Sequence, residues 1–67
     1  MKDELISAAI VQFEAQHRRA EANLRVYLNY PVGVPEHPDA VAEVMALTKI
    51  IAEAQECIDV LKGLQDA

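Results

Sequence analysis

Apolar and small residues recur along the first half of the chain at alternating spacings of four and three residues, the pattern of a coiled-coil helix. The series is Ile6, Ile10, Phe13, His17, Ala20, Leu24 and Tyr27, with His17 as its one polar member. It predicts a helix over about residues 3–29, with Asp3 as N-cap. Pro31 should end this helix, because the residue before a proline is pushed out of the helical region.

The second half of the chain repeats the spacing. Its series is Ala40, Val44, Leu47, Ile51, Ala54, Ile58 and Leu61. This pattern predicts a second helix over about residues 38–63. Pro38 suits the first helical position and Asp39 the second, where a carboxylate meets free backbone N–H groups. Gly63 suits the left-handed position just after the last helical turn.

Two such series joined by a turn at about residues 30–37 predict an antiparallel helical hairpin, one all-α domain over residues 1–67. Folding the halves together sets large residues against small ones, Phe13 against Ala54 and Leu47 against Ala20. Such volume compensation is what knobs-into-holes packing favours. Because neither series was aligned to produce this match, the match supports the hairpin.

The chain has more apolar positions than one seam can cover. The additional positions are Ala8, Ala9, Val11 and Ala15 in the first helix and Ala46, Ile50, Cys57, Val60 and Leu64 in the second. The core of a 67-residue chain rarely supplies more than about 3–5 kcal/mol of folding stability unless a disulfide, a metal or oligomerisation adds to it. A lone cysteine excludes an internal disulfide, and no zinc-site spacing occurs. We therefore expect a homodimer forming a four-helix bundle, or a larger bundle.

The net charge of −5 argues against nucleic acid and anionic lipid as partners. Three arginines, Arg18, Arg19 and Arg25, are the basis of an alternative, a nucleic-acid-associated accessory protein. No signal peptide and no apolar run of about 20 residues is visible, so no membrane partner is expected. With its one unpaired cysteine, the chain is expected in a reducing cytoplasm.

The sharpest chemical motif is Glu14-x-x-His17, the local pattern of di-iron carboxylate bundles. A metal site would also need carboxylates facing inward from the second helix, where Ile50, Ile51 and Ala54 stand instead. His17 is therefore interpreted as a polar seam residue that fixes the register, and a metal-binding bundle is kept as an alternative. No nucleophile motif or phosphate-binding loop occurs, so we expect no enzyme and no cofactor.

The connecting stretch YPVGVPEHPD contains all three prolines. A proline at each end and a glycine that permits positive φ are what a connection between two helices needs. Glu36 and His37 have no such duty. We expect these two side chains to be the partner-binding candidates of the turn.

The residues Pro31, Val32, Gly33, Val34, Glu36, His37, Pro38 and Asp39 resemble the turn of a group of small uncharacterised helical proteins of tailed bacteriophages, marine cyanophages among them. There a segment similar to NPVGIGEHPD joins two predicted helices, and Pro35 replaces its second glycine here. The resemblance implies a helical hairpin and a phage source, and transfers no activity. We expect a small oligomeric adaptor that binds itself and a host or phage protein, in the host cytoplasm if phage-encoded.

Overall fold

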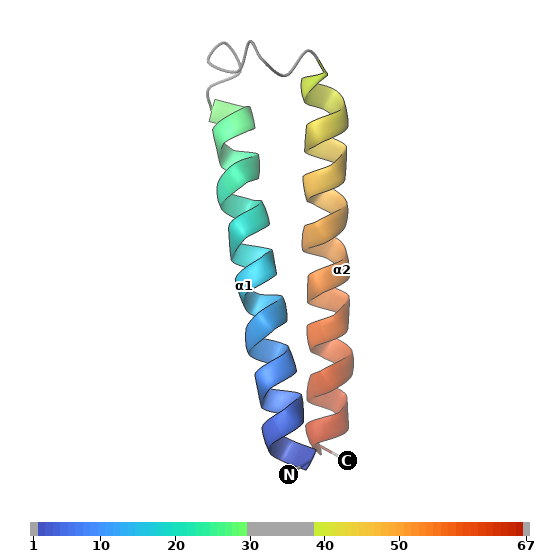
Figure 1. The fold of residues 1–67 in the computed structure, drawn as a ribbon. Coiled ribbons are helices and arrows are strands. Elements are labelled where there is room, and N and C mark those ends of the chain that lie inside the picture. The colour runs from blue at the N-terminus through green and yellow to red at the C-terminus, as the bar shows by residue number, and fades with distance from the viewer. Residues whose placement is uncertain (1, 30–38, 67) are drawn as a thin grey trace.

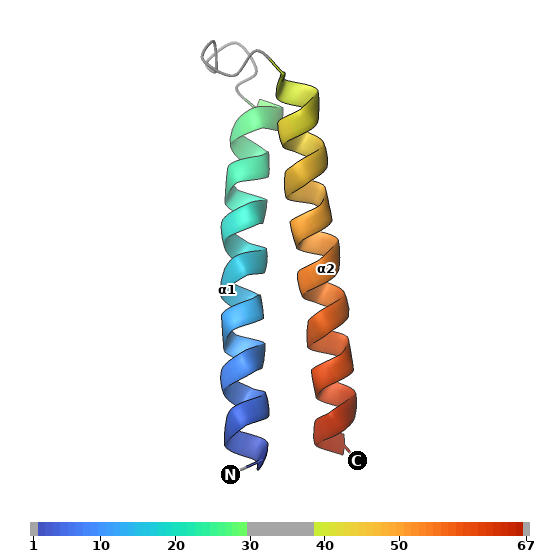
Figure 2. The same ribbon diagram turned by 45° about the vertical axis from the view of Figure 1, so that its right-hand side comes forward.

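The computed structural model describes residues 2–29 and 39–66, which form two long helices. Helix α1 covers Lys2–Asn29 and helix α2 covers Ala40–Asp66. They lie side by side and antiparallel, with the two chain ends together at one end of the molecule (Figures 1 and 2). The described part of the chain contains no strand. The predicted all-α hairpin is therefore confirmed, while the turn assigned to residues 30–37 and the role of Pro38 lie outside the described residues.

Helix α1 begins before the predicted N-cap. Asp3 lies in the first turn together with Glu4, so the prediction that Asp3 caps the helix is wrong. Both carboxylates instead stand near the positive end of the helix dipole, where negative charge is stabilising. At its other end α1 extends to Asn29, as predicted.

Helix α2 begins at Ala40, two residues later than the sequence suggested. Asp39 precedes the helix, and its Oδ1 accepts a hydrogen bond of 2.9 Å from the backbone N–H of Ala42. The Asp39 carbonyl accepts a second bond, of 3.3 Å, from the backbone N–H of Glu43. This is the geometry of an N-cap residue, so the placement of Asp39 at the second helical position is wrong.

The prediction for Gly63 is also wrong. Helix α2 continues through Gly63 to Asp66, and the described glycine has no positive φ. No heavy atom would lie within 4 Å of a Cβ built on it. The residues after Gly63 can continue the helix because none is a proline and Leu64 and Gln65 are ordinary helix formers.

The predicted seam forms the contact between the helices. Each of its members in α1, and those of α2 from Val44 to Leu61, is buried or half-buried. Ala40, at the first position of α2, is exposed. A cluster of Ile6, Ile10 and Ile58, with Phe13 and Leu61 packed against it, forms the largest part of the core.

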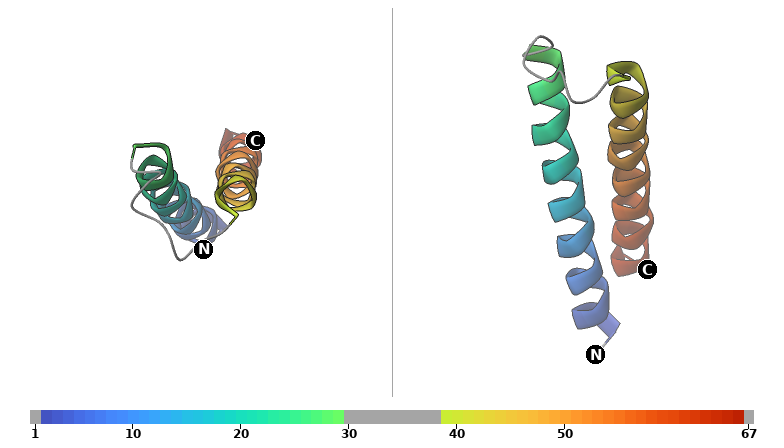
Figure 3. Two further views of the ribbon diagram at one scale, coloured as in Figure 1. Left: turned by 90° about the horizontal axis from the view of Figure 1, so that it is seen from above. Right: turned by 45° about the horizontal axis from the view of Figure 1, so that its top comes forward.

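The most deeply buried residues of the seam are two alanines, one on each helix. Ala54 is 2% exposed and Ala20 is 3% exposed, the lowest fractions in the core. A small side chain on one helix leaves room for a larger one on the other, and the predicted pairing sets Ala54 against Phe13 and Ala20 against Leu47. The two alanines were the small members of the predicted large-and-small pairs. Viewed along its length, the hairpin has helix axes that are inclined to each other (Figure 3).

The hairpin is thin and exposes much apolar surface. It measures 47 × 15 × 14 Å and has a radius of gyration of 15.1 Å, against about 11 Å for a compact domain of this length. Large apolar side chains remain exposed on both helices. They are Leu5, Val11, Val26, Leu28, Val41, Met45, Ile50, Val60 and Leu64. In the described residues, neither helix combines the length and the apolar character that a membrane crossing requires.

Candidate functional site

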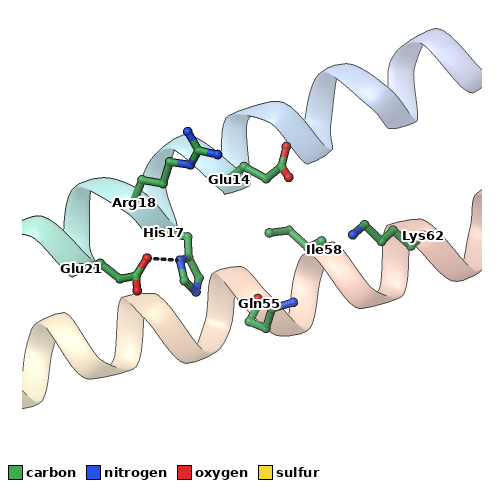
Figure 4. A pocket seen from close by; sticks show the side chains of 7 residues that line it. All are labelled: Glu14, His17, Arg18, Glu21, Gln55, Ile58 and Lys62. Atoms are coloured by element: carbon green, nitrogen blue, oxygen red, sulfur yellow. Dashed lines mark hydrogen bonds and ion pairs between the residues drawn. The ribbon is translucent and has the colours of Figure 1, made fainter.

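The two long sides of the hairpin differ in chemistry. One side, the polar flank, carries a surface hollow of about 170 Å³ lined mainly by charged and amide side chains (Figure 4). Its lining residues are Glu14, His17, Arg18, Glu21, Gln55, Ile58 and Lys62. The polar flank is the place where the sequence-predicted pair of Glu14 and His17 lies.

His17 is held by a neighbour on its own helix. Its Nδ1 lies 3.1 Å from Glu21 Oε1, one helical turn further along α1. The ring points toward α2, and the dashed line in Figure 4 marks its bond. The His17 side chain is 22% exposed and that of Glu21 is 42% exposed. With its proton on Nδ1, a neutral imidazole donates to this carboxylate, which leaves Nε2 as an acceptor.

Glu14 and His17 line the same hollow, but they do not build a metal centre. Within residues 2–29 and 39–66, no group of three or more His, Cys, Asp or Glu side chains is arranged to hold a metal ion. The carboxylate bonded to His17 is that of Glu21, which was not among the predicted site residues. The i,i+4 spacing of His17 and Glu21 was the signal that would have found it.

The arginines do not form one basic patch. Arg18 lines the hollow of the polar flank, whereas Arg19 lines a different hollow with Ala20 and Ile50. All three arginines of the predicted group are exposed, and Arg25 lines neither hollow. A surface that binds nucleic acid needs its cations clustered and interleaved with aromatic rings. This arrangement gives no such surface in the described helices.

The side opposite the polar flank, the second flank, has two hollows along its length. The one nearer the chain ends, of about 350 Å³, is mainly apolar. It is lined by Ala9, Phe13, Glu56, Cys57, Val60 and Leu61. The other, of about 370 Å³, is lined by Gln16, Arg19, Ala20, Asn23, Leu47 and Ile50. Cys57, one of the apolar positions outside the seam, is half-buried in the apolar hollow.

Tyr27 lies near the end of α1, where the carboxylate of Glu43 on α2 acts electrostatically on its phenol. Loss of solvent around the phenol raises the pKa of Tyr27 above its usual value of 10.0, and the nearby carboxylate of Glu43 raises it further. Both effects disfavour the phenolate. The pair of Tyr27 and Glu43 was not predicted from the sequence, because nothing in the local spacing connects positions 27 and 43.

The partner-binding candidates Glu36 and His37, together with the rest of the connecting stretch, lie outside the described residues. Their expected role stays a prediction. No protein-family model, curated protein or solved structure matches the chain.

Proposed function

We propose that this chain is a small non-enzymatic structural protein that self-associates and serves as an adaptor for another protein. The observation that carries the proposal is the amount of apolar surface outside the seam. Nine large apolar side chains of the described residues are exposed, against a core of five buried residues, of which two are alanines. Self-association is the simplest way for such a chain to cover that surface.

The surface area supports the same proposal. The chain exposes 5218 Å², about 1,000 Å² more than the roughly 4,200 Å² expected of a folded monomer of 7.4 kDa. A standard protein interface removes about 800 Å² from each partner. The excess therefore has the size of one interface for each chain.

The adaptor part of the proposal rests on what self-association through one flank would leave exposed. The polar flank, with its hollow around His17, would remain available to a second protein. Glu36 and His37 are the residues of the connecting stretch that we propose for binding it. The turn resembles that of small phage proteins, which favours a host or phage protein as this partner, in the cytoplasm of the host. A protein that co-purifies with the native chain, and does not co-purify with the double variant Glu36→Ala/His37→Ala, would support this role.

Sedimentation velocity over a range of micromolar concentrations tests self-association directly. We expect a dimer or larger species whose helicity falls on dilution, because folding and association are coupled in so small a core. Leu47→Asp, which places a charge in the half-buried seam, should abolish helicity and association together. Thr48→Asp, the same charge at the exposed neighbouring position, is the matched control and should preserve both. A well-folded monomer at these concentrations would refute the proposal.

A further inference from the structure

Each helix carries a second stripe beside the seam, with the same alternating spacing. In α2 the stripe is Glu43, Ala46, Ile50, Glu53, Cys57, Val60 and Leu64. In α1 it is Leu5, Ala9, Gln12, Gln16, Arg19, Asn23 and Val26. Members of both stripes line the two hollows of the second flank, Ala9 with Cys57 and Val60, and Arg19 with Ile50. The two stripes therefore lie on one side of the hairpin and together form the second flank.

The second flank changes character along its length. Near the chain ends it is apolar, with Leu5 and Ala9 on α1 and Val60 and Leu64 on α2. Leu5 is 66% exposed and Val60 is 59% exposed. Toward the middle the two stripes carry opposite charges. These are Arg19 on α1 and Glu53 on α2, and both are exposed. The polar flank mixes apolar residues with charges here, since Val11 and Ala15 share a hollow with Glu14 and Arg18, and Gln55 and Lys62 stand on α2.

We propose that the second flank is the contact between two copies of this chain, which pack with their turns at the same end so that α1 of each copy lies over α2 of the other. This inference rests on the self-association proposed above and names its surface and geometry. The resulting four-helix bundle has a twofold axis parallel to the helices. Every neighbouring pair of helices in it is antiparallel, which sets opposite ends of their dipoles together.

The order of residues along the two stripes fits this arrangement. A twofold contact uses the same surface on both copies, so α1 must be complementary to α2 along the flank. Rotation about an axis parallel to the helices keeps each residue at its own level. Ala20 shares a hollow with Leu47, which sets Arg19 level with Thr48. Glu53 lies five residues, or about 7.5 Å, further along α2, an offset that the long side chains of an arginine and a glutamate can span together. An arginine of one copy therefore stands within reach of Glu53 of the other.

The apolar ends of the stripes also meet. Ser7 and Gln65 are joined by a hydrogen bond of 3.2 Å, which brings the first turns of α1 to the level of the end of α2. Leu5 of one copy then lies against Leu64 of the other. Apolar residues meet at this end and opposite charges meet in the middle.

The alternative twofold arrangement, with the turns at opposite ends, does not give this match. It sets α1 against α1 and α2 against α2. Arg19 would then face the partner's first helix and Glu53 the partner's second, so the opposite charges would not meet. The charge pattern therefore favours the arrangement with both turns at one end.

Charge exchange tests the contact by sedimentation equilibrium. Arg19→Glu and Glu53→Arg should each raise the dissociation constant of the dimer about tenfold, and the double variant should restore it to near the native value. The two single changes alter the net charge in opposite directions. If only repulsion between two acidic chains mattered, Arg19→Glu would weaken the dimer and Glu53→Arg would strengthen it.

Matched controls lie on the polar flank. Arg18→Glu and Glu14→Arg make the same changes in net charge at exposed positions that this arrangement leaves outside the contact. Circular dichroism of each variant verifies that the helices are retained. If a charge reversal lowers the helicity, a double-mutant cycle of the milder changes Arg19→Gln and Glu53→Gln measures the same interaction between positions 19 and 53.

The outcomes separate the two proposals. A dimer whose response to the Arg19 and Glu53 changes equals that of the controls overturns this contact and leaves self-association standing. If the native chain is a folded monomer at all concentrations, both proposals are wrong, and the second flank is then a contact for a different protein. Restoration by the double variant supports both.

Discussion

Gln65 Nε2 donates a hydrogen bond of 3.2 Å to Ser7 Oγ, and these two side chains lie 58 residues apart in the sequence. The bond joins the last turn of α2 to the second turn of α1. It requires α2 to remain helical beyond Gly63, since otherwise Gln65 would leave the side of α2 that faces α1. The position of Gly63 inside the helix is therefore part of how the two chain ends are brought together.

Gly63→Ala should stabilise the protein by about 0.5–1 kcal/mol, because glycine in a helix interior loses more backbone entropy than alanine does. The site has room, since nothing lies within 4 Å of the added Cβ. Urea unfolding at fixed protein concentration measures the change. Ala52→Gly, at an exposed interior position of the same helix, should cost about the same amount. A loss of stability in Gly63→Ala would mean that Gly63 has the left-handed conformation that its sequence context suggested.

Asp39→Ala should lower the free energy of unfolding by about 1 kcal/mol, because the backbone N–H of Ala42 loses its acceptor. Asp39→Asn is the matched control. Asparagine is an equally good N-cap, so its stability should stay within a few tenths of a kcal/mol of the native value. Equal losses in both variants would show that the charge, rather than the capping bond, is what matters at position 39.

Ala54→Leu should lower the free energy of unfolding by about 1–3 kcal/mol, because a larger side chain has no space between closely packed helices. Ala54 is 2% exposed. Ala52→Leu adds the same atoms at an exposed position two residues away and should change stability by less than about 0.5 kcal/mol. Thermal and urea unfolding of the pair measure the difference. A gain in stability for Ala54→Leu would contradict the tight packing around Ala54.

The pKa of Tyr27 should depend on the charge of Glu43. Both loss of solvent and the Glu43 carboxylate raise the Tyr27 pKa above 10.0. A raised pKa in the folded state stabilises the fold below the unfolded value near 10, and this contribution is lost as pH rises through the folded pKa. Glu43→Gln should lower the pKa while leaving it above 10.0. Phenolate absorbance in a Tyr30→Phe background isolates Tyr27, and an unchanged pKa in Glu43→Gln would contradict the coupling.

The seam was predictable because it depends on periodicity alone. The positions from Ile6 to Tyr27 and from Val44 to Leu61 are buried or half-buried as their spacing required. Periodicity is a property of many residues together, so one polar member such as His17 does not disturb it. The pairing of small with large residues across the seam followed from the same pattern.

The helix ends and the side-chain pairs were less predictable. Asp39 and Gly63 have residue types that suit several positions near a helix end, and the surrounding chain decides among them. The bond of His17 to Glu21 competed in the sequence with an equally plausible pairing to Glu14. The proximity of Tyr27 to Glu43 depends on how the two helices are aligned, which no local pattern contains.

The isoleucine cluster lies near the chain ends, at the opposite end of the hairpin from the turn. Helix termini ordinarily fray first, but here the strongest apolar contacts hold the beginning of α1 against the end of α2. Amide hydrogens around Ile6, Ile10 and Ile58 should then exchange more slowly than those beside the turn. Shortening that reaches Ile6 from one terminus or Leu61 from the other would remove the most cooperative part of the molecule, whereas most small domains tolerate the loss of terminal residues.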